Sequence, residues 1–248
     1  MITLVPEVEA GRRTPAELQD TAERGAALLA GAEVDPHRAA IRTIEWAGRE
    51  FGERFCVTSS FADAVLAHLV SSVIPGIEVI FIDTGLHFAE TLRIRDQVAR
   101  TLPLRVISVT PVRTVGQQDG EYGPRLFARS PDECCALRKV EPLERGLRPY
   151  DAWAAGLRRD EGPTRANTPL IGFDRNRGKV KIAPLAYWTE DRVNAYISAH
   201  NVPVNPLIEA GFASIGCWPC TRRTAPGEDP RAGRWPMFDK TECGLHAS

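Results

Sequence analysis

Short, continuously apolar runs are separated by longer stretches with helical patterning along most of the chain. The clearest run begins at residue 78 and stops abruptly at Asp83-Thr84-Gly85. Runs of this kind are typical of parallel strands that are buried on both faces. Predicted strands lie at residues 54–59, 78–83, 104–109, 150–156 and 179–184. Their alternation with helices predicts an α/β fold, a mostly parallel sheet flanked by helices and joined by right-handed crossovers.

Stretches with apolar residues at helical spacing predict the helices. Asp35 precedes Pro36, and Thr189 precedes Glu190, which are typical signals for the start of a helix. Predicted helices lie at residues 15–32, 36–51, 63–73, 90–101, 136–147 and 189–200. The segment 116–133 is rich in turn-forming residues, and no helix or strand is predicted there.

The length of the chain allows one large domain with appendages. Its 248 residues and mass of 27.3 kDa suffice to bury a full hydrophobic core. We predict an N-terminal helical extension at 1–35, a nucleotide-binding α/β domain at 36–215, and a cysteine-rich catalytic segment at 216–248.

Charge and hydropathy narrow the classes of function. The formal net charge is −1, which gives no overall attraction to nucleic acid or to a membrane surface. No apolar run reaches the length of a transmembrane helix. The first residues, with Glu7 and Glu9, do not resemble a signal peptide. We therefore expect a cytoplasmic protein that binds neither nucleic acid nor membrane.

Two loops follow predicted strands and carry polar side chains. Residues 58–63 contain Ser60 and Asp63, and residues 83–87 contain Asp83 and Gly85. Each loop alone is explained equally well as a helix cap or a turn. Ligands on parallel sheets bind beyond the carboxyl ends of strands, so the two loops together favour a nucleotide site. The chain has neither Gly-x-Gly-x-x-Gly nor a Walker lysine loop, which argues against a dinucleotide fold or a kinase-type NTPase.

Six cysteines fall into two pairs and two single residues. Cys56 lies inside a predicted strand, where a cysteine is usually a small buried apolar residue. The pairs are Cys134-Cys135 and Cys217-x-x-Cys220. Cys-x-x-Cys is a common metal half-site, but adjacent cysteines suit a cluster of several irons better than a single zinc ion. The spacing therefore favours an iron–sulfur cluster, and a zinc site and a Cys217–Cys220 redox disulfide remain as alternatives.

Cys243 is left over near the end of the chain. An inconsequential surface thiol is the simplest interpretation of such a cysteine. Arg231, Arg234 and Lys240 precede it, and His246 follows. Cationic neighbours lower the pKa of a thiol and make the thiolate available, so we predict a nucleophile.

Taken together, the two cysteine pairs and the terminal Glu-Cys-Gly-Leu-His at 242–246 resemble a known family. The likeness is to the assimilatory adenylyl-sulfate reductases, the iron–sulfur branch of the phosphoadenylyl-sulfate and adenylyl-sulfate reductases. It extends from about residue 40 to the end of the chain. Supporting motifs lie at residues 82–85, 135–143, 156–160, 181–185 and 231–235.

The resemblance implies a Rossmann-like adenine-nucleotide α-hydrolase fold, an enzyme and a cofactor. Cys134, Cys135, Cys217 and Cys220 would hold a 4Fe–4S cluster that passes no electrons to the substrate. Cys243 would attack the sulfur of adenylyl sulfate, releasing AMP and leaving an S-sulfocysteine. Reduced thioredoxin would then release sulfite, as a step of sulfate assimilation toward cysteine. Relatives also suggest a homo-oligomer.

The resemblance further assigns roles to individual residues. The phosphosulfate would meet Lys139, Arg231, Arg234 and His246. The adenosine and its phosphate would be surrounded by Ser60, Asp63, Asp83, Gly85, Gly156 and Arg158. Lys139 follows Cys135 by one helical turn, so a single helix can place it between cluster and substrate.

Other functions remain open from the sequence. Reduction of 3′-phosphoadenylyl sulfate, alone or beside adenylyl sulfate, would need extra cations near the ribose. A non-catalytic nucleotide-binding protein with zinc or an iron–sulfur centre would keep the paired cysteines without needing Cys243. The near-neutral charge argues against a member of that class that binds tRNA.

Overall fold

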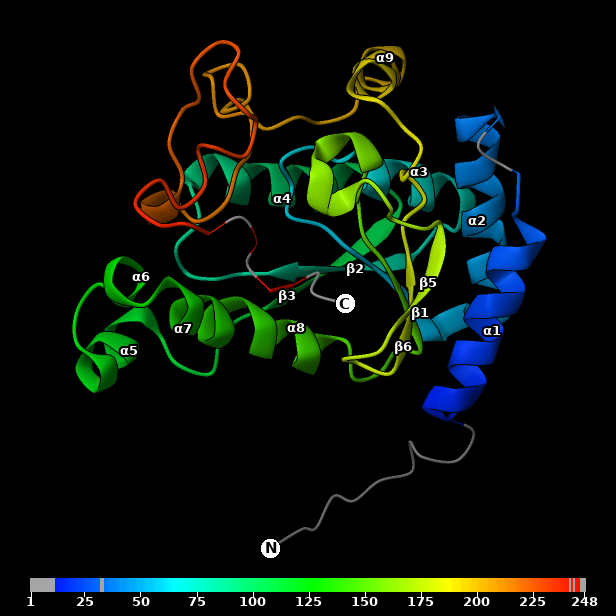
Figure 1. Ribbon diagram of the computed structural model, residues 1–248, viewed down its shortest axis with the longest axis horizontal. Helices are drawn as coiled ribbons and strands as arrows, with labels where there is room; N and C mark the ends of the chain where they lie inside the picture. Colours follow the sequence, from blue (N-terminus) through cyan, green and yellow to red (C-terminus); the bar gives the residue numbers. More distant parts are fainter. Residues whose placement is uncertain (1–11, 32–33, 241, 243, 246–248) are drawn as a thin grey trace, which may run out of the picture.

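A six-stranded sheet forms the centre of the molecule. The computed structural model describes residues 12–31, 34–240, 242 and 244–245 (Figure 1). The strand order is β3-β2-β1-β4-β6-β5. The strands are β1 (Phe55–Thr58), β2 (Ile77–Ile82), β3 (Leu104–Val109), β4 (Ala152–Ala154), β5 (Ile171–Asp174) and β6 (Lys179–Ile182). All neighbours are parallel except β5 and β6, so the predicted α/β fold with a mostly parallel sheet is confirmed.

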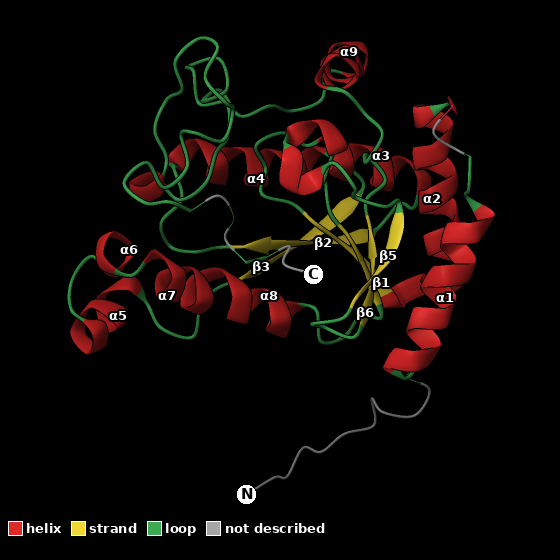
Figure 2. Cartoon of the chain, in the orientation of Figure 1, coloured by secondary structure: helices red, strands yellow, loops and turns green. Residues whose placement is uncertain are grey.

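Helices lie on both faces of the sheet (Figures 1 and 2). They are α1 (Pro15–Leu28), α2 (Pro36–Phe51), α3 (Val65–Val73), α4 (Ala89–Thr101), α5 (Val115–Tyr122), α6 (Leu126–Arg129), α7 (Pro131–Cys135), α8 (Glu141–Gly146) and α9 (Glu190–His200). Helices α3 and α4 cover one face, and α8 covers the other beneath β2 and β3. Helix α1 packs against β5 and β6. No helix among the described residues is long and apolar enough to cross a membrane.

The two predicted helix starts, at Asp35 and Thr189, are confirmed. The Asp35 side chain accepts a hydrogen bond from the Arg38 amide, with Pro36 at the first helical position. Thr189 caps α9 through the Arg192 amide. Side chains of this kind satisfy amides that have no partner in the first helical turn. Cys56 is fully buried in β1, as expected of a small core residue, and burial raises the pKa of its thiol.

In two regions the structure contains elements that the sequence did not predict. The segment 116–133 contains α5, α6 and the start of α7 instead of turns. The signal missed there was a capping box, in which Thr114 and Gln117 each bond the other's backbone amide. Strand β5 was also missed, because it is four residues long, contains Gly172 and forms an antiparallel edge.

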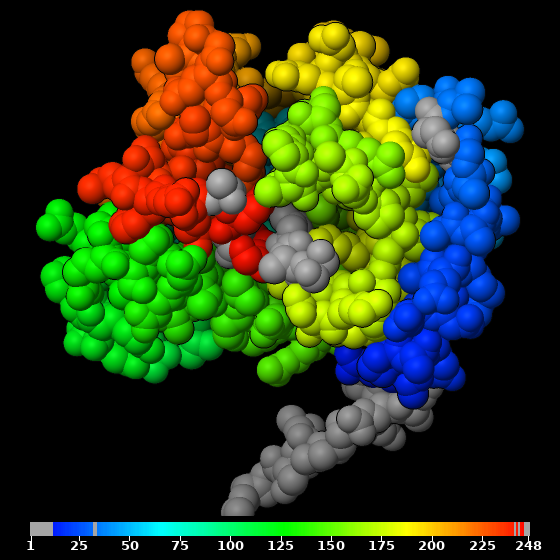
Figure 3. Space-filling model, viewed as in Figure 1, coloured from blue at the N-terminus to red at the C-terminus, as the bar shows by residue number. Residues whose placement is uncertain are grey.

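Loops from distant parts of the chain meet at the carboxyl edge of the sheet. Strands β2, β1 and β4 are neighbours and parallel, so the loops after them share this edge. An isolated bridge joins Asp63 to Val204, and another joins His87 to Cys217. In the space-filling view the terminal segment, in red, is wedged between the green segment that forms α5–α8 and the yellow-green chain after β4 (Figure 3). The edge predicted to bind ligand is therefore covered by the C-terminal segment.

Candidate active site

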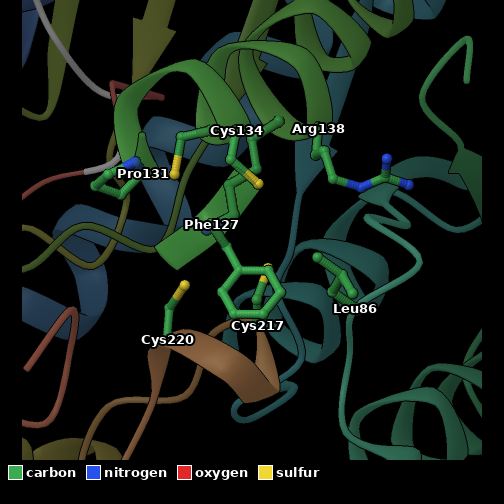
Figure 4. Close-up of a pocket in the computed structure, with 9 residues that line it drawn as sticks. Leu86, Phe127, Pro131, Cys134, Arg138, Cys217 and Cys220 are labelled. Carbon is green, nitrogen blue, oxygen red and sulfur yellow. The ribbon is translucent and has the colours of Figure 1, made fainter. Parts of the chain in front are cut away.

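The four paired cysteines line one pocket. Cys134 and Cys135 lie on α7. On the opposite side, Cys217 precedes the short 3₁₀ turn Trp218–Cys220 and Cys220 ends it (Figure 4). Three of the four are buried and Cys220 is partly exposed. The pocket is completed by Leu86, Phe127, Pro131, Arg138 and Lys139. The structure thus brings together the whole set of ligands predicted from the sequence.

The thiols of this pocket affect one another's ionisation. Burial, together with the charges of the other three cysteines, raises the pKa of the Cys134 thiol to about 12. Burial also raises the pKa of Cys220 to about 11. Thiolates so close together repel each other unless a positive centre binds them. The donor set therefore fits an iron–sulfur cluster in its chemistry. Among the described residues, no group of three or more Cys, His, Asp or Glu side chains is placed to hold a single metal ion.

A redox disulfide of the thioredoxin kind is not what the structure shows. Such motifs open a helix, whereas Cys217 precedes and Cys220 ends a 3₁₀ turn of only three residues. Both are free thiols, like the other described cysteines.

A π-helical turn follows the first cysteine pair. Residues Ala136–Val140 form this turn between α7 and α8, and both Arg138 and Lys139 are buried there. Single π turns inside α-helices are frequent at functional sites. The predicted continuous helix 136–147 is therefore wrong in its start and in its regularity, although Lys139 does line the cysteine pocket.

Arg138 ties the π turn to the loop after β2. Its Nε donates to the Thr84 carbonyl oxygen at 2.6 Å, and its Nη1 donates to Gln118 Oε1 at 3.0 Å. The Thr84 hydroxyl lies 3.4 Å from the Cys217 sulfur, within hydrogen-bond distance for sulfur. Thr84 and Arg138 were not predicted as site residues, although they lie within the motifs at residues 82–85 and 135–143.

Three cationic side chains lie around the ring of a buried tryptophan. Trp235 is 1% exposed. Around its ring lie Lys139 Nζ at 5.6 Å, the Arg234 guanidinium at 4.6 Å and Lys240 Nζ at 5.4 Å. The face of an indole attracts cations, so the ring can hold like charges close together. Lys139 and Arg234, both predicted to meet the phosphosulfate, thus lie around one ring, and the sequence analysis did not assign Trp235 to the site.

Backbone pairing connects this tryptophan to the second cysteine pair. The Trp235 amide donates to the Cys220 carbonyl oxygen at 3.0 Å, and Thr221 and Arg234 form a bridge. The Arg234 guanidinium lies over Gly216, where an added Cβ would approach it to 2.2 Å. Only a glycine leaves room for the arginine at this distance.

Arg231 belongs to a second group of charged side chains, which includes Glu242 of the terminal segment. Its Nη2 lies 3.1 Å from Glu242 Oε2, and Arg165 Nη2 lies 3.1 Å from Glu242 Oε1. Arg165 also pairs with Glu161 at 2.6 Å. Neither Arg165 nor Glu242 was predicted as a site residue. The predicted nucleophile Cys243 and the predicted His246 lie outside the described residues.

The predicted nucleotide loops form turns at the expected edge. Asp63 accepts a hydrogen bond from the Val65 amide at 2.9 Å, and burial raises the pKa of its carboxyl group. Asp83 accepts one from the Gly85 amide at 3.1 Å, and Gly85 has φ of +69°. Both aspartates therefore have the turn role considered from the sequence, whereas the N-cap of α3 is Ala64 and carries no side-chain cap hydrogen bond. Ser60 is exposed beside them.

The last two predicted nucleotide-binding residues follow β4. Gly156 is exposed just beyond the end of the strand. Arg158 is partly buried, and its Nε donates to Asp160 at 2.9 Å. Because β4 neighbours β1, these residues lie at the same edge as the loops after β1 and β2.

The chain is similar to known proteins over most of its length. Residues 54–223 match the model of the phosphoadenosine phosphosulfate reductase domain. The chain is 56% identical over 234 residues to an adenosine 5′-phosphosulfate reductase of Streptomyces coelicolor, covering 94% of this chain and 97% of the relative. A reductase of the same name from Mycobacterium tuberculosis is 47% identical over 257 residues, covering 97% and 99%.

Solved structures with the same fold include a reductase and an adenylyltransferase. A phosphoadenylyl-sulfate reductase from Candida auris superposes with a TM-score of 0.67 at 28% identity, covering 82% of this chain and 97% of that one. An FMN adenylyltransferase from Candida glabrata gives a TM-score of 0.54 at 13% identity, covering 97% and 87%. The second likeness concerns the fold alone.

Proposed function

The chain belongs to the phosphoadenosine phosphosulfate reductase domain family, and from this premise we propose that it reduces adenylyl sulfate to sulfite and AMP. The observation that carries the proposal is the pocket of four cysteines with Lys139 on its wall. Lys139 and Arg234 both lie over the ring of Trp235, which supports a cationic site next to the cysteine pocket. Relatives named adenosine 5′-phosphosulfate reductase match nearly the whole chain.

The cofactor of this proposal is a 4Fe–4S cluster. Cys134, Cys135, Cys217 and Cys220 would hold it. Once bound, it would take up the charge of four thiolates and set the local field without exchanging electrons with the substrate. Arg138 and Thr84 would support the cluster ligands from the second layer, since one joins the π turn to the loop after β2 and the other contacts Cys217.

The nucleophile of this proposal is Cys243. Its thiolate attacks the sulfur of adenylyl sulfate, the bond between that sulfur and the bridging oxygen breaks, and AMP leaves with the electron pair. An S-sulfocysteine remains on the enzyme. A thiolate of reduced thioredoxin then attacks the Cys243 sulfur and sulfite departs. The second thioredoxin thiol resolves the mixed disulfide, so the two electrons come from thioredoxin.

Cations make the first step feasible. The thiolate and the phosphosulfate repel each other, and negative charge develops on departing AMP. Lys139, Arg231, Arg234 and His246 are the groups we assign to offset these charges. For the adenosine and its phosphate we assign the edge formed by the loops after β1, β2 and β4, with the residues Ser60, Asp63, Asp83, Gly85, Gly156 and Arg158.

The setting of this reaction would be assimilatory sulfate reduction toward cysteine, in the cytoplasm, with a thioredoxin as partner. A homo-oligomer stays a prediction that sedimentation would test. The domain boundaries at residues 35 and 215 likewise stay predictions, which expression of residues 36–248 without the N-terminal helix would probe.

The decisive experiment combines composition with turnover. Anaerobically purified protein should contain iron and acid-labile sulfide near four each per chain, as a 4Fe–4S cluster requires. It should release sulfite from adenylyl sulfate with reduced thioredoxin. Cys243→Ser should keep the cluster and lose sulfite release, whereas Cys56→Ser should keep both. Zinc without sulfide, or a fully active Cys243→Ser enzyme, would contradict the proposal.

A second candidate is reduction of 3′-phosphoadenylyl sulfate. It is favoured by the name of the Candida auris neighbour, a phosphoadenylyl-sulfate reductase. Comparing kcat/KM for the two substrates decides between them. The proposal requires adenylyl sulfate to be preferred by at least about tenfold, which corresponds to about 1.4 kcal/mol of transition-state discrimination.

A further inference from the structure

Two arginines from distant parts of the chain share the carboxylate of Glu242. Arg165 ends the 3₁₀ turn Pro163–Arg165, and its Nε and Nη2 donate to Glu242 Oε1 at 3.2 and 3.1 Å. Arg231 lies in the terminal segment, and its Nη2 is 3.1 Å from the other carboxylate oxygen, Oε2. The group therefore joins the chain after β4 to the end of the chain.

This ion-pair group is shielded from solvent more than most surface pairs. The side chains of Arg165, Arg231 and Glu242 are 12%, 20% and 29% exposed. Partial burial reduces the screening of the charges by water and salt. The contacts to Arg165 are close to a fork that grips a planar carboxylate. The described part of the terminal segment is thus fixed at Glu242.

The same arrangement is suited to other anions. Guanidinium groups bind carboxylate, phosphate and sulfate oxygens through the same geometry. In the proposed function, Arg231 meets the phosphosulfate of the substrate. The carboxylate of Glu242 and the substrate's anion would then be competing for one guanidinium.

We propose that Glu242 is an internal substitute for the phosphosulfate group. It holds Arg165 and Arg231 while the site lacks substrate, and it gives way when the substrate's anion binds. The inference rests on the proposed function, because that function supplies the anion. Glu242 is a positioning residue in this scheme and does not itself react.

The position of Glu242 in the sequence gives the exchange a consequence. Glu242 immediately precedes Cys243, the proposed nucleophile. On the other side of Cys243, Leu245 packs against the hydrophobic core, and a Cβ at Gly244 would lie 3.5 Å from Val140. Displacing the carboxylate would release one of the two attachments around the nucleophile. Binding of the substrate would thereby loosen the chain at Glu242, next to the proposed nucleophile.

Ligand affinity is the first test. Glu242→Gln removes the competing charge and keeps the shape of the side chain. Partly buried pairs contribute about 1 kcal/mol, so this variant should bind ADP about fivefold more tightly than the wild type. ADP is the probe because its second phosphate extends beyond AMP as the sulfate does. AMP itself should gain less than about twofold in affinity.

Glu161→Gln is the matched control. Glu161 also pairs with Arg165, at 2.6 Å, but it belongs to the chain after β4 and not to the terminal segment. Calorimetric titration of the cluster-loaded proteins gives the ratio of ADP to AMP affinity for each variant. The ratio should rise only in Glu242→Gln. An unchanged ratio there, or an equal rise in Glu161→Gln, would overturn the proposal.

A second readout needs no ligand. Trypsin cleavage after Lys240 isolates residues 241–248, which contain Cys243 as their single cysteine. Alkylation of native protein, followed by digestion, reports how accessible this thiol is. Glu242→Gln should be alkylated several times faster than the wild type and Glu161→Gln should not. Equal alkylation rates in all three proteins would refute the proposal that Glu242 holds the segment around Cys243. Neither test requires turnover, so failure of the proposed function would be recognised separately, as wild-type protein that releases no sulfite.

Discussion

The two edges of the sheet use similar charged residues in opposite ways. At the amino edge, Arg54 precedes β1 and donates to Asp151 through Nε at 2.6 Å and Nη2 at 3.0 Å. The Tyr150 hydroxyl donates to Glu78 at 2.5 Å, and Lys179 Nζ donates to the Tyr150 carbonyl oxygen. Each of these polar groups faces a complementary group of the protein itself.

At the carboxyl edge, cations are gathered around groups of a different kind. Lys139, Arg234 and Lys240 approach the ring of Trp235, which carries no charge. Four thiols point into one pocket beside them. Lys240 also pairs with Asp132, and Arg234 donates to the Ser214 hydroxyl and the Ile215 carbonyl oxygen. The buried thiols are the groups that need a ligand here, because neighbouring thiolates repel each other unless a positive centre binds them. We therefore propose that the amino edge stabilises the fold, whereas the carboxyl edge is organised to bind ligands.

The strongest way to break this comparison is to replace one lysine on each edge. Lys139 and Lys179 are both 7% exposed, so methionine of similar length is a matched substitution. Lys139→Met should lower kcat for sulfite release by at least about a hundredfold, because it removes a cation facing the developing charge. Affinity for AMP should change by less than about threefold, because AMP lacks the sulfate.

Lys179→Met serves as the control for this loss. Lys179 lies at the opposite edge of the sheet from the proposed reaction. The kcat of Lys179→Met should therefore stay within about twofold of the wild-type value. Iron content must be equal in the three proteins for the comparison to hold. If Lys139→Met lost kcat and AMP affinity equally, or if Lys179→Met were as inactive, the functional contrast between the edges would be wrong.

The second prediction concerns Gly216, which leaves room for the Arg234 guanidinium. Gly216→Ala places a Cβ where the guanidinium lies, at 2.2 Å, so the arginine has to move. We expect kcat/KM to fall about tenfold, since a small displacement of a charged group weakens transition-state contacts. Gly116→Ala is the control, because a Cβ there meets nothing within 4 Å. Wild-type kinetics in Gly216→Ala would show that Arg234 does not need its present position.

The sequence predicted the layers of this molecule better than the details of its site. Runs such as 78–83 identify strands because a strand buried on both faces must be apolar throughout. Cys134 and Cys217 could be assigned to one site because their chemistry requires partners. No local pattern shows that Arg165 and Glu242 meet across 77 positions in the chain, since that contact follows from the way the terminal segment folds back. The π turn at Ala136–Val140 escaped prediction for a related reason. It is a local irregularity in an otherwise helical pattern.

The smallest effect we predict is a dependence of stability on pH at the amino edge. Burial lowers the pKa of Lys179 to about 8, below the value of about 10.4 for an exposed lysine. Between these values the unfolded chain binds a proton that the folded protein does not. The free energy of unfolding contributed by this group therefore rises as the pH increases from 8 toward 10.

Lys179→Met isolates that contribution. Lys181 also has its pKa lowered to about 8 by burial, so the wild type alone cannot assign the effect to one lysine. Urea unfolding of both proteins at pH 7.5 and pH 9.5 gives the difference. The wild type should gain about 1 kcal/mol more than Lys179→Met over this interval. Equal gains would mean that Lys179 keeps an ordinary pKa in the folded protein. Its hydrogen bond to the Tyr150 carbonyl oxygen would then compensate fully for its burial.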